Sequence, residues 1–169
     1  LPICQAGDPV LREKARHVSR EEITTPAVQQ LIANIKHTVA ERDYGVGLAA
    51  PQVGQALALS VIAIKPTPNR PDREPFEQVI INPSYTGIGQ TTGMWEGCAS
   101  GDEGRLFAQA QRYQQINAQW DDEWGEHGFV AHVFQHEADH CQGILFFDRV
   151  ADTTTYMTAA EYRKRVVRR

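Results

Sequence analysis

Apolar residues recur at helical spacing between Pro26 and Ala40. They repeat at intervals of three and four positions: Val28, Leu31, Ile32, Ile35 and Val39. This spacing gathers them on one face, so the segment can lay an apolar stripe on a core. Thr25 stands before it as an N-cap residue, and Pro26 occupies the first helical position, where no N–H is needed. The pattern predicts an amphipathic helix, which Gly45 and Gly47 then interrupt.

Other stretches read as strands. The apolar positions of residues 56–64 indicate a strand, and Val79–Ile81 indicates a short buried strand that Asn82-Pro83 ends. Between them, residues 65–75 contain four prolines and predict an exposed loop. Residues 105–120 suggest further strands, although their alternation is poor. The chain therefore contains both helices and strands, without an internal repeat or a linker.

Length and composition set broad limits. At 169 residues, with 41% hydrophobic and 22% charged residues, the chain predicts one globular domain spanning residues 1–169. A net charge of −4 argues against a specific nucleic-acid partner. No apolar run approaches the roughly 20 residues that cross a bilayer, so we expect no membrane partner. Three cysteines without disulfide-type spacing favour a reducing compartment, and we expect the cytoplasm.

Two histidines in the late part of the chain carry the clearest chemical signal. His136 and His140 are four positions apart in the motif His136-Glu137-Ala138-Asp139-His140. On a helix this spacing puts both imidazoles on one face, where they can hold one divalent metal. Glu137 then projects beside them as a proton acceptor for an attacking water. The motif predicts metal-dependent hydrolysis; the alternative is a polar surface helix.

A third ligand is needed, and two downstream candidates are weak. One class of zinc hydrolases places a third histidine six residues after the second, but Phe146 stands there, and a phenyl ring cannot coordinate. Another class uses a glutamate about twenty residues further on, and Glu161 lies 21 positions beyond His140. Glu161 also completes a capping sequence that begins at Thr158, which gives its carboxylate a local role. A zinc endopeptidase with Glu161 as the ligand remains open.

An upstream cysteine is the better candidate. Cys98 lies between small residues in the stretch Glu96-Gly97-Cys98-Ala99-Ser100. One thiolate and two imidazoles hold a borderline-soft metal and leave a fourth position for water or substrate. Most free cysteines are buried and serve only packing, and Cys4 and Cys141 fit that description.

With these motifs the chain resembles the peptide deformylases. The signature segments occur in order along nearly the whole chain: Gly45-Val46-Gly47-Leu48-Ala49-Ala50-Pro51-Gln52, Glu96-Gly97-Cys98-Ala99-Ser100 and Gln135-His136-Glu137-Ala138-Asp139-His140. The flanks agree as well: Asp8-Pro9-Val10-Leu11-Arg12, Ile81-Asn82-Pro83 and Gly143-Ile144-Leu145-Phe146-Phe147-Asp148-Arg149. The resemblance implies an α+β fold, with short, mostly antiparallel strands around a central helix that carries the metal.

The resemblance also implies an activity and a site. The activity is removal of the N-formyl group from N-formylmethionyl peptides of nascent proteins, with release of formate. The implied metal ligands are Cys98, His136 and His140, and the implied catalytic groups are Glu137, the Gln52 amide and the backbone N–H of Ala99. Fe²⁺ is the expected metal in cells, with Zn²⁺, Ni²⁺ and Co²⁺ as alternatives that the same ligands accept.

The substrate is expected to bind as an added strand beside the glycine-rich first motif, with an apolar slot for the first side chain. Arg105 matches a family arginine that meets a peptide carbonyl. The residues expected to contact the substrate are Val46, Gly47, Leu48, Met94, Gly97, Arg105, Phe129, His132 and Val133. Hydroxamate inhibitors are expected to bind at the same place.

Several positions depart from the family pattern. Ala99 replaces a leucine, Gly101-Asp102 replaces an aliphatic-proline pair and should loosen the wall, and His132 brings a titratable group into the slot. Ala110 stands where an arginine usually supports a buried carboxylate, so Glu96 or Asp139 lacks its cation unless Arg112 substitutes. These departures leave open a deformylase with a specialised substrate or low activity, and a protein that only sequesters inhibitors.

The C-terminus is basic, with Arg163, Lys164, Arg165, Arg168 and Arg169. Because deformylases act on nascent chains, these residues suggest docking on the ribosome near the exit tunnel. The charge pattern itself favours a solvated helix face over such docking.

Overall fold

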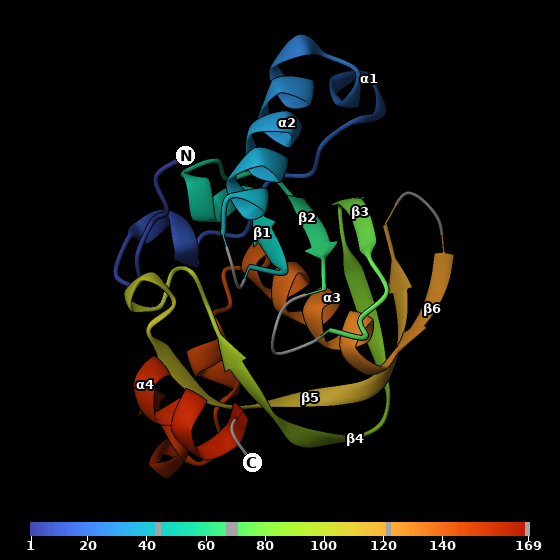
Figure 1. Ribbon diagram of the computed structural model, residues 1–169. Helices are drawn as coiled ribbons and strands as arrows, with labels where there is room; N and C mark the ends of the chain where they lie inside the picture. The colour runs from blue at the N-terminus through green and yellow to red at the C-terminus, as the bar shows by residue number, and fades with distance from the viewer. Residues whose placement is uncertain (43–44, 67–70, 121–122, 168–169) are drawn as a thin grey trace.

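A central helix, α3 (Gly128–Cys141), lies between two antiparallel sheets (Figure 1). The computed structural model describes residues 1–42, 45–66, 71–120 and 123–167, and the side chains of these ranges except those of 123–129. The helix packs against β1 and β2 of one sheet and against β5 of the other. This is the α+β architecture implied by the sequence resemblance. The Phe129 side chain and parts of the proline-containing loop lie outside the described residues.

The first sheet has the order β1 (Gly47–Ala49), β2 (Leu59–Ile64) and β3 (Phe76–Ile81). β2 begins three residues later than the apolar pattern predicts, and β3 extends three residues further toward the N-terminus. β3 ends as predicted before Asn82, whose φ of 54° leaves the extended conformation. The Asn82 amide accepts a hydrogen bond from the Val18 N–H and donates one to its carbonyl, both at 2.9 Å.

The second sheet has the order β4 (Ser84–Gly97), β5 (Leu106–Gln119) and β6 (Glu123–His127), and the short β7 (Met157–Thr158) also pairs with β5. The predicted strands of residues 105–120 are confirmed by β5. β4 was not foreseen, because its middle is rich in glycine, threonine and glutamine and is exposed, which leaves little apolar periodicity to detect. A bulge between Ile88 and Thr91 further interrupts its register.

Helix α2 (Pro26–Ala40) confirms the predicted amphipathic helix. The Thr25 hydroxyl accepts a hydrogen bond from the Val28 N–H, so the cap forms as the sequence indicates. The buried face of α2 packs with β1 and β2 into one apolar core, whose members include Val28, Ile32, Ile35, Val39, Leu48, Leu59 and Val61. In Figure 1, α2 lies above the first sheet, away from the second.

Short helical turns connect these elements. They are α1 (Arg20–Ile23), η1 (Pro9–Arg12), η2 (Ala50–Val53), η3 (Asp102–Gly104), η4 (Phe146–Arg149) and η5 (Thr153–Thr155). The last described elements are α4 (Ala159–Tyr162) and the wider turn η6 (Arg163–Val167) that continues it, beside β4 and β5 (Figure 1). Among the described residues, no helix has both the length and the apolar character needed to cross a bilayer.

Candidate metal centre

Three side chains converge where α3 passes the end of β4. His136 and His140 lie on the same face of α3, one turn apart, and their Nε2 atoms are 3.3 Å from each other. Cys98 follows directly after β4, and its Sγ lies 3.3 Å from His140 Nε2. The three ligand atoms all lie within 4.8 Å of one another, and both Cys98 and His140 are buried. The structure therefore brings together the three residues that the sequence proposed as ligands.

The spacing of these atoms fits a metal ion. Metal–nitrogen bonds of about 2.0 Å and metal–sulfur bonds of about 2.3 Å set tetrahedral edges of roughly 3.3–3.5 Å. Burial lowers the pKa of His136, but Cys98 and Glu96 outweigh burial and raise that pKa well above its ordinary value. The centre therefore favours positive charge. Burial keeps the pKa of His140 well below its ordinary value, which favours the neutral imidazole that a metal requires.

A buried carboxylate orients the first histidine. Glu96 Oε2 accepts a hydrogen bond from His136 Nδ1 at 2.8 Å, which leaves Nε2 with its lone pair toward the cluster. The other oxygen, Oε1, accepts from His132 Nε2 at 2.7 Å. Burial raises the pKa of Glu96, but its histidine and arginine partners outweigh burial and hold the pKa well below its ordinary range. His132, expected in the substrate slot, thus also serves this carboxylate.

Arg112 supplies the cation for Glu96 and Asp139, which the sequence left open because Ala110 carries no charge. It donates to both oxygens of Glu96, at 2.5 and 3.1 Å, and to Asp139 Oδ2 at 2.6 Å. Its side chain is only 1% exposed. Asp139 also accepts two hydrogen bonds from Arg149, at 2.8 and 3.0 Å, and one from Tyr85. Both carboxylates are therefore paired, although Ala110 carries no charge.

Glu137 points into the centre from the inner face of α3. Its Oε2 is buried and has no hydrogen-bond partner among the described residues. Burial raises the pKa of Glu137 to about 7. A Cβ added to Gly47 of β1 would lie 2.3 Å from Glu137 Oε1, so only glycine at that position leaves room for the carboxylate. An unpaired carboxylate with this pKa can take up and return a proton near neutral pH.

Gln52 lies beside the cysteine. It is buried in η2, and its Oε1 accepts a hydrogen bond from the Ala49 N–H at 2.9 Å. That bond fixes the amide so that Nε2 points at Cys98 Sγ, 3.4 Å away, and at Ser100 Oγ, 3.1 Å away. An N–H donor is therefore held beside the metal cluster, where the sequence resemblance implied one.

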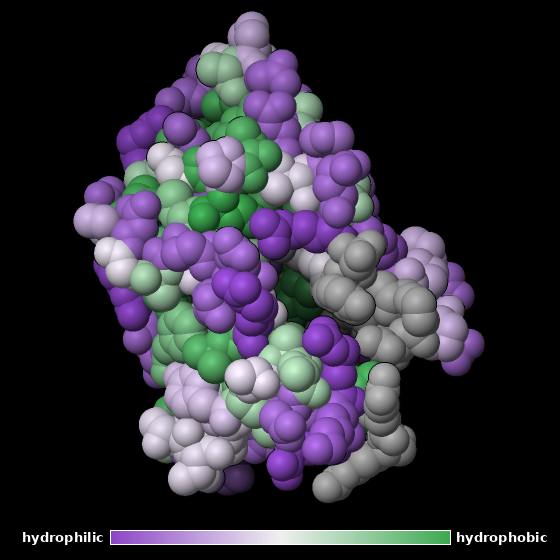
Figure 2. All heavy atoms as spheres, turned by 60° about the vertical axis from the view of Figure 1, so that its left-hand side comes forward, coloured by the Kyte–Doolittle hydropathy of each residue, from purple (hydrophilic) through white to green (hydrophobic). Residues whose placement is uncertain are grey.

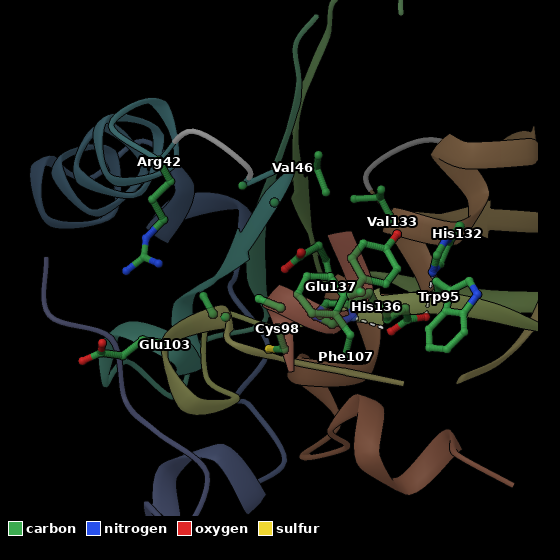
Figure 3. Close-up of a pocket in the computed structure, with 18 of the residues that line it drawn as sticks. Arg42, Val46, Trp95, Cys98, Glu103, Phe107, His132, Val133, His136 and Glu137 are labelled. Carbon is green, nitrogen blue, oxygen red and sulfur yellow. Dashed lines mark hydrogen bonds and ion pairs between the residues drawn. The ribbon is translucent and has the colours of Figure 1, made fainter. Parts of the chain in front are cut away.

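A cavity of about 680 Å³ opens onto these groups (Figure 3). Figure 2 shows a hollow with hydrophobic atoms at its floor. Besides the cluster, the lining includes Ala99 and five residues that the sequence assigned to the substrate: Val46, Gly47, Gly97, His132 and Val133. The cavity thus reaches from the metal centre to the surface between the two sheets.

Three other expected substrate residues do not line the cavity. Leu48 is buried in the core beneath α2. Met94 belongs to β4 but alternates away from Gly97, so Trp95 lines the cavity instead. Arg105 is exposed and pairs with Asp102 and Glu103. The two-residue period of β4 could have indicated Trp95, had the strand been recognised.

Glu161 does not join the metal centre. Its N–H is capped by the Thr158 hydroxyl, as the sequence predicts, and its carboxylate accepts a hydrogen bond from Arg165 at 2.5 Å. The structure also differs from the sequence prediction at Gly101. This residue is buried, and a Cβ there would lie 3.0 Å from the Phe147 ring. The loop after Cys98 is therefore closely packed on Phe147, whereas the sequence predicted a looser wall.

A Cys-His-His cluster with an unpaired glutamate at the floor of an open cavity defines the class of metal-dependent hydrolases. The sequence model of the family described as polypeptide deformylase matches residues 1–156. The chain is 39% identical to peptide deformylase 2 of Nostoc sp. over 99% of this chain and 96% of that protein. It is also 39% identical to peptide deformylase 1 of Bifidobacterium longum, over 96% and 79% respectively. The chain belongs to the polypeptide deformylase family.

Solved structures agree with this assignment. A Met-Ala-Ser-bound class I type b peptide deformylase from Acinetobacter baumannii superposes with a TM-score of 0.81. That structure is 31% identical in sequence, and the match covers 89% of this chain and 98% of the other. The same enzyme bound to actinonin gives a TM-score of 0.77 at 28% identity, with the same coverage.

Proposed function

We propose that this chain removes the N-formyl group from N-formylmethionyl peptides, using one divalent metal held by Cys98, His136 and His140. The observation that carries the proposal is the cluster of three ligand atoms, with His140 Nε2 3.3 Å from both Cys98 Sγ and His136 Nε2, beside the buried, unpaired carboxylate of Glu137. Family membership and the Met-Ala-Ser complex of the Acinetobacter enzyme support a formylated peptide as the substrate.

When bound, the metal acts as a Lewis acid and lowers the pKa of water from about 16 towards about 7. Glu137 accepts the proton of the attacking water while the water oxygen bonds to the formyl carbon. The same carboxyl group then gives the proton to the peptide nitrogen as the C–N bond breaks. Formate and a free amino terminus are the products, so no other reactant is needed.

Negative charge develops on the formyl oxygen during the attack. The Ala49 N–H orients the Gln52 amide, and its Nε2 can donate to that oxygen by exchanging one of its hydrogen bonds to Cys98 and Ser100. We assign the second donor to the backbone N–H of Ala99, which lines the cavity next to Cys98. In other hydrolases, one donor of this kind lowers the activation barrier by about 3 kcal/mol.

The sheet edges explain how diverse peptides could bind. β1 and β4 each stand at the end of the strand order among the described residues, and Gly47 and Gly97 from these strands line the cavity. An extended peptide added there would form main-chain hydrogen bonds that do not depend on sequence. Val46 and Val133 offer apolar contact to the first side chain.

The finer expectations complete the proposal. Fe²⁺ is the proposed metal, because peptide deformylases commonly use it and a thiolate with two imidazoles accepts it. We place the reaction on nascent chains in the cytoplasm. Of the basic residues at the C-terminus, Lys164 and Arg165 pair with Glu161, and residues 168–169 lie outside the described part of the chain. Ribosome docking through this surface stays a prediction.

The decisive experiment is anaerobic purification followed by metal analysis and a formate-release assay on the same sample. We expect about one metal per chain and formate from formyl-Met-Ala-Ser. Cys98→Ala should lose both, whereas the control Cys4→Ser, whose thiol lies outside the cluster, should keep both. Metal retained by Cys98→Ala together with cleavage inside a peptide would instead support the endopeptidase alternative. Tight hydroxamate binding without turnover would support a sequestering protein.

His132 favours one variant of the proposal. Its ring lines the cavity beside Val133 and is held by Glu96, so the slot for the first side chain has a polar wall. A specialised formylated substrate is therefore the second candidate. Comparing kcat/KM for formyl-Met-Ala-Ser with peptides that carry other formylated first residues tests it; a preference for methionine would exclude it.

A further inference from the structure

The loop that follows β4 carries the backbone donor assigned to Ala99. This loop, residues 98–104, is called the donor loop below, and Figure 3 labels Cys98 and Glu103 on it. The Cys98 carbonyl accepts a hydrogen bond from the Gly101 N–H at 2.8 Å, which closes a turn. In a trans peptide the carbonyl and the N–H point in opposite directions. The Ala99 N–H therefore points away from that hydrogen bond, and the turn sets its direction.

The end of the donor loop has a strained backbone. Asp102 and Glu103 have φ angles of 50° and 55°, and Gly104 follows at 80°. The left-handed region is unfavourable for a residue with a Cβ, and two such residues occupy it in succession. Arg105 pairs with both carboxylates, but all three side chains are exposed, where ion pairs contribute little. A backbone of this kind persists only where its surroundings hold it.

The first residues of the chain supply such contacts. Gln5 Nε2 donates to the Ala99 carbonyl at 3.1 Å, and Gln5 Oε1 accepts from the Glu103 N–H at 2.9 Å. Between these two points, the Ala6 N–H donates to the Ser100 carbonyl at 2.8 Å. One amide side chain thus ties the donor residue to the strained end of the donor loop.

The same segment also contacts the other donor. The Cys4 N–H donates to the Gln52 carbonyl at 2.8 Å. Residues 4–6 therefore touch both groups that we assign to the formyl oxygen. Gln5 does not line the cavity, so it has no contact with a bound peptide. Any effect of Gln5 on the reaction has to pass through the donor loop.

We propose that Gln5 is a positioning residue: its amide fixes the donor loop so that the Ala99 N–H is aimed at the formyl oxygen. The proposal rests on the deformylation proposed above. The formyl oxygen gains its negative charge only in the transition state, so a misaligned donor weakens the transition state more than the bound peptide. Loss of the Gln5 amide therefore lowers kcat and leaves KM nearly unchanged.

The kinetic test is formate release from formyl-Met-Ala-Ser by the metal-loaded full chain. Gln5→Ala removes both hydrogen bonds to the donor loop and should lower kcat about 10–30-fold, with KM changed by less than about twofold. Gln5→Glu keeps the size of the side chain and the acceptor for the Glu103 N–H, but at pH 7 it cannot donate to the Ala99 carbonyl. It should lower kcat about fivefold or more.

The matched control is Gln29→Ala. Gln29 Nε2 also donates to a main-chain carbonyl, that of Ile23 at 2.7 Å, but in a turn that does not line the cavity. This variant loses the same kind of hydrogen bond and should keep the kcat and KM of the unchanged chain.

Hydrogen–deuterium exchange gives a readout that does not depend on activity. In the metal-loaded proteins, the peptide that covers the donor loop should exchange at least about fivefold faster in Gln5→Ala than in the unchanged chain, while α2 and β2 exchange as before. Metal content should stay near one per chain. The residue before Cys98, Gly97, pairs with Phe107 of β5, which holds the ligand independently of Gln5.

Four results would overturn the role of Gln5: an unchanged kcat, a higher KM at unchanged kcat, a lower kcat without faster exchange of the donor loop, or loss of the metal. If Gln5→Ala does not fold, Gln5→Glu is judged by the same results. Failure of the proposed function looks different, because the unchanged chain would then release no formate from any formylated peptide. Faster exchange of the donor loop in Gln5→Ala would still support Gln5 as its support in that case, and equal exchange would reject it.

Discussion

Arg112→Met removes the buried cation between two carboxylates and replaces it with an unbranched, uncharged side chain of similar volume. Arg112 donates three hydrogen bonds, two to Glu96 and one to Asp139. Removing one partner of a buried ion pair costs about 3–5 kcal/mol, because a charge is left without compensation. Each carboxylate keeps other donors here, so we expect the lower end, about 3 kcal/mol. For a chain of this length that corresponds to a fall of roughly 6–12 °C in Tm.

The assay is urea unfolding of metal-free protein at pH 7, extrapolated linearly, with thermal unfolding as a second measure. The matched control is Arg12→Met, whose partner Asp148 is also a carboxylate. Both of those side chains are exposed, at 51% and 40%, so this change should cost less than about 1 kcal/mol. Equal costs for Arg112→Met and the control would refute the argument from burial.

The pH dependence of stability tests the direction of this effect. The pKa of Glu96 is depressed in the fold, so its pairing stabilises the protein above the ordinary value of 4.5 and is lost as pH falls below it. In Arg112→Met the pKa of Glu96 is depressed less, so acid removes less of the free energy of unfolding. The difference in free energy of unfolding between the unchanged chain and Arg112→Met should therefore become smaller below about pH 4.5. Since Glu96 orients His136, metal affinity measured by chelator competition should also fall by about 10–100-fold.

Three further changes test other parts of the structure. Gly47→Ala should lower formate release about 100-fold without unfolding the chain, because the new Cβ displaces the Glu137 carboxylate; full activity would contradict this. Asn82→Ala should cost about 2–3 kcal/mol in urea unfolding, since it loses two hydrogen bonds at a positive φ; a loss below 1 kcal/mol would contradict it. Burial raises the pKa of Cys141 to about 12, so iodoacetamide at pH 8 should modify the partly exposed Cys4 well before Cys141, as mass spectrometry would show; equal rates would contradict this.

Local patterns were enough to predict helix α2 and the placement of the two histidines. The apolar spacing and the Thr25-Pro26 start defined α2, and the i, i+4 spacing placed His136 and His140 on one face. Cys98 required more, because a cysteine in a small-residue loop has no periodic signal. The chemistry of a thiolate with two imidazoles suggested it as the third ligand, and the resemblance to a family, confirmed by the match over residues 1–156, strengthened that connection.

The cavity wall could not be predicted in the same way. β4 has an exposed, glycine-rich middle, so its two-residue period was not visible and Met94 was chosen where Trp95 lines the wall. Tyr162 reaches the cavity only because β7 pairs with β5, a contact between distant parts of the chain. Propensity and periodicity describe neighbours in sequence, and they carry no information on such a pairing.

The sequence resemblance leads one to expect an arginine at position 110, and the structure finds the buried cation at position 112 instead. Ala110 and Arg112 are two residues apart on β5 and both are buried, so they face the same side of the strand. The two Cα positions are about 7 Å apart, a distance that a long, flexible arginine side chain spans. Ala110 taken alone indicates an uncompensated site, whereas the structure shows that Arg112 pairs with both carboxylates. The charges that hold His136 are therefore in place without an arginine at position 110.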